Sequence, residues 1–323
     1  MNFVRKLPGP LLIFFGALSL SFGGLIVKSF DGATLWQILF WRSIFFSLTV
    51  LTFLIISYKK KIFISFYESG LPGFFGGIIL SVGFCGYVFA MYNTTVANTN
   101  FIISLQILFL AIFGFLFLKE KISAITLVSI ILAMTGVFLM VGNSLTSGEM
   151  LGNLVAFSMP ITFAVLIMIV RKFPKVDMVP AQFVAGISCC IIGFFFSSKL
   201  MISSHDIFLG FLAGFFQVGF GFIFITIGAR NTPSAIVGII MLSESVLGPL
   251  WAFLFAGERA SFFTLVGGGI IMLSESVLGP IWAFLFVNER PSMFTLIGGG
   301  IILFAVLLQF YSLLSTSKKK ITN

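Results

Sequence analysis

The sequence predicts an all-α polytopic membrane protein, with two inverted five-helix repeats forming a ten-helix core and one extra hydrophobic segment from a tandem duplication. Three observations lead to this fold class. The 323 residues are 59% hydrophobic and only 9% charged, which leaves too few polar side chains to cover a water-soluble surface. Apolar runs of membrane-spanning length follow one another along the chain. The sequence also repeats itself at two different intervals.

The apolar runs are separated by a few polar or turn-forming residues, so each run predicts one helix. Eleven such runs occupy residues 9–27, 34–57, 71–92, 94–118, 124–142, 151–170, 179–197, 207–229, 232–256, 262–286 and 293–315. Arg5 and Lys6 precede the first run as in a signal peptide, but the run continues to spanning length and is expected to remain as the first span. The polar tail 316–323 is expected to be disordered.

The basic residues lie mostly in the short connections, where they orient membrane helices rather than bind nucleic acid. With a cytoplasmic N-terminus, inside loops hold Lys59, Lys60, Lys61, Lys119, Lys121, Arg171, Lys172, Lys175 and Arg230, and outside loops hold Lys28, Lys199 and Arg259. This bias favours a cytoplasmic N-terminus. An eleventh simple crossing would carry Lys318–Lys320 outside, so either the segment 262–286 is re-entrant or the tail departs from the rule.

A recent duplication makes the number of spans ambiguous. Residues 238–268 and 269–299 align without a gap and differ at six positions. Each copy contains an acid inside an apolar run, Glu244 in the first and Glu275 in the second. The connection from the eighth helix favours Glu244 as the acid of the ninth helix, whereas the tight link to the last helix favours Glu275. On balance we prefer Glu244.

An older repeat divides the chain into halves, 7–142 and 151–315. Residues 93–123 match residues 231–261 at a constant offset, which places Gln106 opposite Glu244. Because five is odd, a chain that crosses five times and then repeats inserts its second half upside down. This is the plan of secondary transporters, whose substrate site lies near the midplane between the halves.

An acid inside an apolar run is costly and therefore a functional candidate. Glu244 costs roughly 2.5 to 3.5 kcal/mol at a helix centre, which about eight Leu, Ile or Phe residues offset. Glu244, Gly248, Trp251 and Phe255 share one helix face. The acid could exchange a proton or pair with a cationic substrate group, or it could only hydrogen-bond to a neighbouring helix. Pro249, after Gly248, either interrupts the helix or is a packed kink.

The remaining candidate site residues are polar groups within apolar runs. Arg42 needs water, a carboxylate or an anionic substrate if it is buried, and the alternative is that it snorkels to the outer interface. Thr99 and Gln106 share one stripe of the fourth helix, with Asn98 nearby, and could bind a polar substrate or only neighbouring helices. Gln217 is the polar member of a glycine stripe on the eighth helix.

Two further patterns have structural interpretations. Small residues line the third and eighth helices, at Gly73, Gly77 and Ser81 and at Gly210, Gly214, Gly221 and Gly228, and they predict close helix packing. Acid–base neighbours such as Glu120–Lys121 end helices at the membrane surface. We interpret those neighbours as solvated pairs of little energetic weight.

Chemistry other than transport has little support. Cys85, Cys189 and Cys190 lie in apolar runs and His205 lies in a loop, so neither a disulfide framework nor a metal cluster is predicted. A GxxxxGK phosphate loop does not occur, and a hydrolase would need its histidine at depth. We therefore expect no cofactor and no enzyme. The expected partners are a small-molecule substrate and membrane lipid, and a homodimer is left open.

The chain resembles the EamA-type permeases of the drug/metabolite transporter superfamily. The resemblance is carried by the basic residue of the second helix (Arg42), by FLKEKIS at the end of the fourth, and by ESVLGPLWAFLFAGER in the ninth. Two departures are Ser245 and Ile107, at places where the family often has proline. The duplicated 31-residue unit is a third.

The resemblance implies export or exchange of small metabolites, commonly amino acids and related compounds, across a bacterial inner membrane. Together with Glu244 it favours a proton-linked secondary transporter. A multidrug exporter for lipophilic cations is the nearest alternative. A membrane-embedded enzyme or a scaffold without transport is more distant, and the fold cannot choose a substrate.

Overall fold

The computed structural model describes residues 7–94, 96–122, 127, 130–131 and 150–256, and the regular elements in this part of the chain are all helices. Several predictions concern residues outside the described ones, namely Glu275, the duplicate copy 269–299, the runs 262–286 and 293–315, the tail 316–323 and most of the run 124–142.

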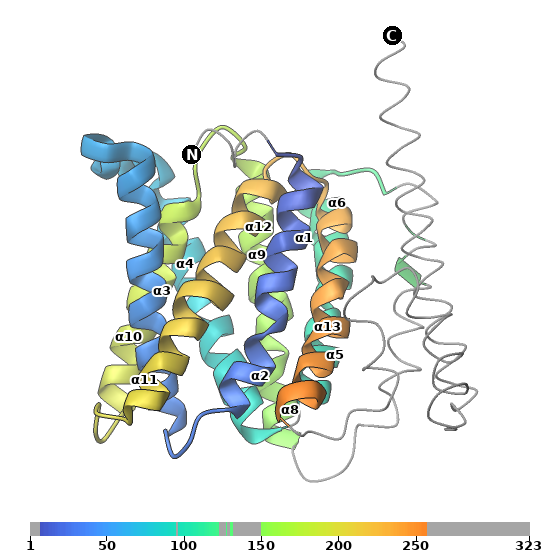
Figure 1. The fold of residues 1–323 in the computed structure, drawn as a ribbon. Coiled ribbons are helices and arrows are strands. Elements are labelled where there is room, and N and C mark those ends of the chain that lie inside the picture. The colour runs from blue at the N-terminus through green and yellow to red at the C-terminus, as the bar shows by residue number, and fades with distance from the viewer. Residues whose placement is uncertain (1–6, 95, 123–126, 128–129, 132–149, 257–323) are drawn as a thin grey trace.

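The helices stand side by side as a bundle (Figure 1). They are α1 (Gly9–Ser21), α2 (Gly23–Lys28), α3 (Leu35–Tyr58), the 3₁₀ turn η2 (Lys59–Lys61), α4 (Ile62–Asn93), α5 (Val96–Ser104), α6 (Gln106–Leu118), α8 (Met150–Ala156), α9 (Ser158–Lys172), α10 (Val179–Phe196), α11 (Ser204–Phe211), the π-helix η4 (Leu212–Phe220), α12 (Gly221–Ala229) and α13 (Ser234–Ala256).

The predicted polytopic membrane architecture is confirmed. Among the described residues, five helical stretches are long and apolar enough to cross a membrane: Gly9–Lys28, Leu35–Asn93, Leu151–Lys172, Val179–Phe196 and Ser204–Ala229. The second of these stretches runs through two predicted spans. Leu54 is buried while its neighbours Ile55 and Ile56 are exposed, as expected for a helix with one face on the bundle and one on lipid.

The two ends of the bundle are defined by contacts between distant segments. At the end called here the N-terminal end, the Tyr58 hydroxyl donates to Asp177 Oδ2 at 2.6 Å, and Gly9 packs against Gly228. At the far end, Lys28 Nζ donates to the Thr94 carbonyl at 3.0 Å. Accordingly α1 begins at the N-terminal end, whereas α8 and α9 run from the far end to it (Figure 1).

Small residues permit close helix packing, as predicted for the third and eighth helices. The α-carbon of Gly77 in α4 lies against the carbonyl of Ala181 in α10. Gly214 in η4 lies against the carbonyl of Arg42 in α3. A β-carbon at either glycine would overlap these backbone atoms, so the glycines set the distance between the helices.

Three predicted spans contain a tightened turn, called here a break, at which one helix ends and the next begins while the backbone keeps right-handed helical angles. The breaks are at Phe22 in the first span, at Leu105 in the fourth and at Phe157 in the sixth. Around Leu105 the hydrogen bonds tighten to the i−3 carbonyl, as in a 3₁₀ turn: Leu105 N–H donates to Ile102 O at 3.1 Å.

Two helix boundaries decide between expectations or differ from them. Of the two alternatives for Gly248–Pro249, the interruption does not occur, since α13 continues through both residues as one helix, Ser234–Ala256. The third helix begins at Ile62 rather than at residue 71, because Ser65 and Ser69 pack on the bundle and hold an additional helical segment there. The spanning part after Gly70 matches the predicted run 71–92.

Candidate functional site

Glu244 is buried in the bundle at the middle of α13. Its side chain is 3% exposed. Ten residues separate it from Ser234, the first residue of α13, which places it about 15 Å from the N-terminal end, half of a hydrocarbon core of roughly 30 Å. The helices packed against α13 include α1, α2, α5 and α6. This acid therefore faces the protein interior rather than lipid.

Two turns beyond Glu244 on α13, Trp251 is fixed to the break in the first span. Its indole N–H donates to Ser21 Oγ at 2.9 Å, and its ring stacks on Phe22 with centroids 4.7 Å apart and planes 10° apart. Ser21 ends α1 and Phe22 is the residue at the break, so Trp251 ties the second half of the chain to the interruption in the first half.

Gly23, the first residue of α2, is the point where three spans converge. A β-carbon on Gly23 would overlap the Tyr87 hydroxyl and approach the Gln217 amide nitrogen to 2.7 Å. Gln217 Nε2 donates to the Leu20 carbonyl at 3.4 Å, while Gln217 Oε1 has no hydrogen-bond partner among the described residues. The predicted polar group of the eighth helix thus lies at the break in the first helix, with an acceptor still available.

Arg42 is buried rather than snorkelling. It is 3% exposed, and its guanidinium carbon lies 5.4 Å from the centroid of the Phe84 ring and 5.1 Å from that of Tyr87. Within the described part of the chain Arg42 Nε has no hydrogen-bond partner. The snorkelling alternative is wrong for this structure because the two rings of α4 and the close approach of η4 hold the side chain inside. A permanent cation there retains a donor for an anion.

Tyr87 connects the two charged groups of the site. Its hydroxyl interacts electrostatically with both Arg42 and Glu244, which come from different halves of the chain. Arg42 and Glu244 do not form an ion pair with each other among the described residues. The cluster of Arg42, Tyr87, Gln217, Glu244 and Trp251, called here the central cluster, therefore brings a cation and an acid within electrostatic range of one phenol.

The fourth-helix candidates lie apart from this cluster. Gln106 begins α6 directly after the break, is 2% exposed, and its Nε2 has no hydrogen-bond partner among the described residues. The adjacent Ile107 packs against Gly238 of α13. Gly238 precedes Glu244 by six residues, which is about 9 Å along the axis of α13. Thr99 is fully buried in α5, which packs on α13. Asn98 is in α5, but its side chain lies outside what the structure describes.

Sequence reasoning missed Tyr87, Phe22 and Ser21. Tyr87 is one of many aromatic residues in apolar runs, and only its place in GYVF beside the small Gly86 sets it apart. The break at Phe22 carries no proline. The Gly23–Gly24 pair was the available signal, since consecutive glycines weaken a helix and let other groups approach its backbone.

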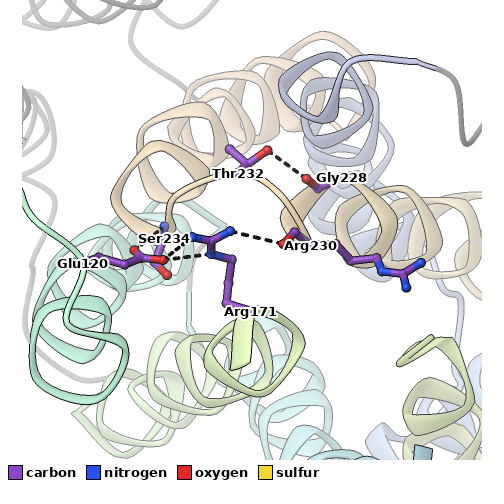
Figure 2. Close-up of polar contacts among 6 residues, drawn as sticks. All are labelled: Glu120, Arg171, Gly228, Arg230, Thr232 and Ser234. Carbon is purple, nitrogen blue, oxygen red and sulfur yellow. Dashed lines mark hydrogen bonds and ion pairs between the residues drawn. The ribbon is translucent and has the colours of Figure 1, made fainter. Parts of the chain in front are cut away.

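A second polar cluster joins four helices at the N-terminal end of the bundle (Figure 2). Arg171, near the end of α9, donates from Nε and Nη2 to Glu120 Oε1 at 2.8 and 2.5 Å. Its Nη1 donates to the Arg230 carbonyl at 3.1 Å. The other carboxylate oxygen of Glu120 accepts the Ser234 N–H at 2.9 Å and so caps α13.

The interpretation of Glu120 as half of a solvated pair with Lys121 is therefore wrong. Its partner, Arg171, lies 51 residues away, and the two side chains are only 15% and 19% exposed. Lys121 is exposed. The cluster of Glu120, Arg171, Arg230 and Ser234, called here the N-terminal latch, fixes the connection between α12 and α13 to the ends of α6 and α9.

Comparison with known proteins agrees with this architecture. A solved structure described only as the crystal structure of a protein superposes with a TM-score of 0.70 at 15% sequence identity, covering 93% of this chain and 96% of that chain. It is one of 26 solved chains that match. At this identity the likeness concerns the fold alone. No curated protein matches the sequence significantly.

The EamA-like transporter family matches the chain twice, over residues 7–142 and over residues 146–275. The two matches together cover most of the 323 residues, and the second includes Glu244, Trp251 and Gln217. The family consists of membrane transporters rather than enzymes, so the molecule that passes through the bundle is a small-molecule substrate. The chain therefore belongs to the EamA-like transporter family of the drug/metabolite transporter superfamily.

Proposed function

We propose that this protein is a secondary transporter that exports or exchanges small metabolites, such as amino acids and related compounds, and that its transport is linked to protons. The observation that carries the proposal is Glu244, a carboxyl group buried at mid-depth in a helix packed against α1, α2, α5 and α6. Such a carboxyl can hold a proton in one state and pair with a cationic substrate group in another.

Arg42 is proposed as the anion-binding group of the same site. Its Nε donor has no hydrogen-bond partner among the described residues, although the guanidinium is almost completely buried. A substrate carboxylate would satisfy this donor, and the ring centroid of Tyr87, whose hydroxyl is within electrostatic range of Glu244, lies 5.1 Å from the guanidinium carbon. A substrate with separate acidic and basic groups is therefore proposed to pair with Arg42 and Glu244. Gln106 and Thr99 are proposed as contacts for bulkier substrates.

The two halves are proposed to be inverted repeats that rock against each other. In support, α1 begins at the N-terminal end, whereas α8 and α9 run toward it from the far end. In this scheme the N-terminal latch is closed in the present structure, and the Glu120–Arg171 pair breaks when that end opens. The proposed N-terminal end is cytoplasmic, in a bacterial inner membrane. The homodimer and Glu275 as the alternative acid of the site stay predictions.

The test is transport by purified protein in liposomes. A panel of amino acids and related metabolites is offered with an imposed pH gradient, and uptake is measured for the wild type, for Glu244→Gln and for the exposed control Glu68→Gln. We expect at least one solute to move with a pH dependence that only Glu244→Gln abolishes. Failure to move any solute of a broad panel would overturn the proposal.

A multidrug exporter is the second candidate, and one observation favours it. Aromatic rings surround the charged groups: Phe22 stacks on Trp251, and Phe84 and Tyr87 flank Arg42. Such rings could hold a lipophilic cation against Glu244. Uptake of a lipophilic cation that competes with no amino acid, together with drug sensitivity of a deletion strain, would favour this candidate.

A further inference from the structure

A short surface helix between the second and third spans, Ile62–Ser69, has no place in the transport scheme. It is bounded by two residues with positive φ, Lys59 (φ 50°) and Gly70 (φ 51°, ψ −153°). At Gly70 the conformation favours glycine, since it is rarely adopted by residues with a side chain. The segment projects sideways from the end of the bundle, at the upper left of Figure 1. It is therefore a separate element at the N-terminal end.

The segment has one face on the protein and one face without a partner. Ser65 and Ser69 are buried, and the Phe66 ring packs edge-on against Phe183 of α10 with centroids 5.6 Å apart. On the other face Phe63 is 83% exposed and Tyr67 is 88% exposed. Aromatic side chains at the end of a membrane-spanning helix are suited to the headgroup level of the bilayer, where an apolar ring and a polar edge are both satisfied.

Positive charge lies directly beside these rings. Lys59, Lys60 and Lys61 form a one-turn 3₁₀ helix immediately after α3, and all three are exposed. None of them forms an ion pair with another described residue. The single acid of the segment, Glu68, is exposed at its other end. Because α3 has just left the apolar core, the three ammonium groups lie at the level where lipid phosphates lie.

We propose that Lys59–Lys61 together with Phe63 and Tyr67 form a binding surface for anionic phospholipid. The lysines attract the headgroups of the leaflet that faces the N-terminal end, and the two rings insert among the glycerol and upper acyl groups. This surface joins α3, which carries Arg42, to α4, which carries Tyr87. Anionic lipid therefore holds the connection between two helices of the central cluster.

The experiment titrates the detergent-solubilised full chain with phosphatidylglycerol, and in a separate arm with phosphatidylcholine of the same acyl chains, and counts bound lipids by native mass spectrometry. The wild type should retain phosphatidylglycerol preferentially. Each lysine near an anionic surface contributes roughly a fivefold gain, so Lys59→Gln/Lys60→Gln/Lys61→Gln should bind phosphatidylglycerol at least about tenfold more weakly. Binding of phosphatidylcholine should not change.

The matched control removes three other exposed lysines, Lys119→Gln/Lys121→Gln/Lys172→Gln, which flank Glu120 and Arg171 of the N-terminal latch. This control should bind phosphatidylglycerol as the wild type does. A loss of equal size in the control, or undiminished binding by the first variant, would overturn the proposal. Thermal melting of both variants checks folding, and a Phe63→Ser/Tyr67→Ser variant should weaken binding of phosphatidylglycerol in the same assay.

Discussion

Replacement of Arg171 in the N-terminal latch is expected to lower the stability of the protein. Arg171 makes three hydrogen bonds, two to the Glu120 carboxylate and one to the Arg230 carbonyl, and both charged side chains are largely buried. Hydrogen bonds to charged groups contribute about 1.5 to 3 kcal/mol each, less where water reaches them. We therefore expect Arg171→Gln to lower the free energy of unfolding by about 2 to 4 kcal/mol.

Glu120→Gln should cost less, about 1 to 2 kcal/mol, because the amide oxygen can still accept the Ser234 N–H. The charge swap Glu120→Arg/Arg171→Glu separates the contribution of the ion pair from that of the hydrogen bond to the Ser234 N–H. It restores opposite charges, but an arginine at position 120 cannot accept a hydrogen bond, so the Ser234 N–H loses its acceptor. The swap should therefore remain less stable than the wild type.

The assay is the apparent melting temperature in detergent, with the neighbouring Lys172→Gln as the control. For a chain of this size 1 kcal/mol corresponds to roughly 1.5 °C, so Arg171→Gln should melt about 3 to 6 °C lower. A shift no larger than that of Lys172→Gln would mean that burial adds nothing to the Glu120–Arg171 pair. Full recovery by the charge swap would refute the role assigned to the Ser234 N–H.

Three further predictions concern the central cluster. Gly23→Ala should reduce the initial rate of transport at least about tenfold, because the added β-carbon overlaps the Tyr87 hydroxyl. The control is Gly76→Ala, whose β-carbon meets only the end of a flexible Ile169 side chain. Arg42→Lys should lose most transport although the positive charge is kept, because an ammonium group cannot lie flat against the rings of Phe84 and Tyr87 as a guanidinium does. Equal transport rates for Arg42→Lys and the wild type would contradict this prediction. Trp251→Phe keeps an aromatic ring but removes the hydrogen bond to Ser21, so the free energy of unfolding should fall by about 1 kcal/mol, seen as a lower melting temperature. Adding Ser21→Ala to this variant should lower the free energy of unfolding little further.

Much of the fold could be predicted because the bilayer imposes the length and composition of each span. The burial of Glu244 and Arg42 could be expected for the same reason: a charged group in an apolar run is costly in contact with lipid, so it faces the protein interior. The order of helices and the two related halves also followed from repeated sequence.

The partners of these groups could not be predicted, since they depend on contacts between distant spans. Nothing local to Glu120 indicates Arg171, and the adjacent Lys121 is the more obvious partner. Tyr87 could not be separated from other aromatic residues until the convergence on Gly23 was known.

The positions at which helices break were the second feature that could not be predicted from the sequence. The breaks at Phe22 and Leu105 contain no proline, while Gly248–Pro249, which does suggest a break, lies within a continuous helix. Tertiary packing can override such local preferences in both directions. The surface helix Ile62–Ser69 was missed because its signal is amphipathic rather than apolar.

The proposed coupling of substrate movement to protons through Glu244 is tested most directly by the pH inside liposomes. A trapped fluorescent dye reports that pH when a transported solute is added without any imposed gradient. We expect a solute-dependent pH change for the wild type and for Glu68→Gln, and none for Glu244→Gln even where solute exchange persists. A solute-driven pH change of wild-type size in Glu244→Gln would show that Glu244 does not couple the two.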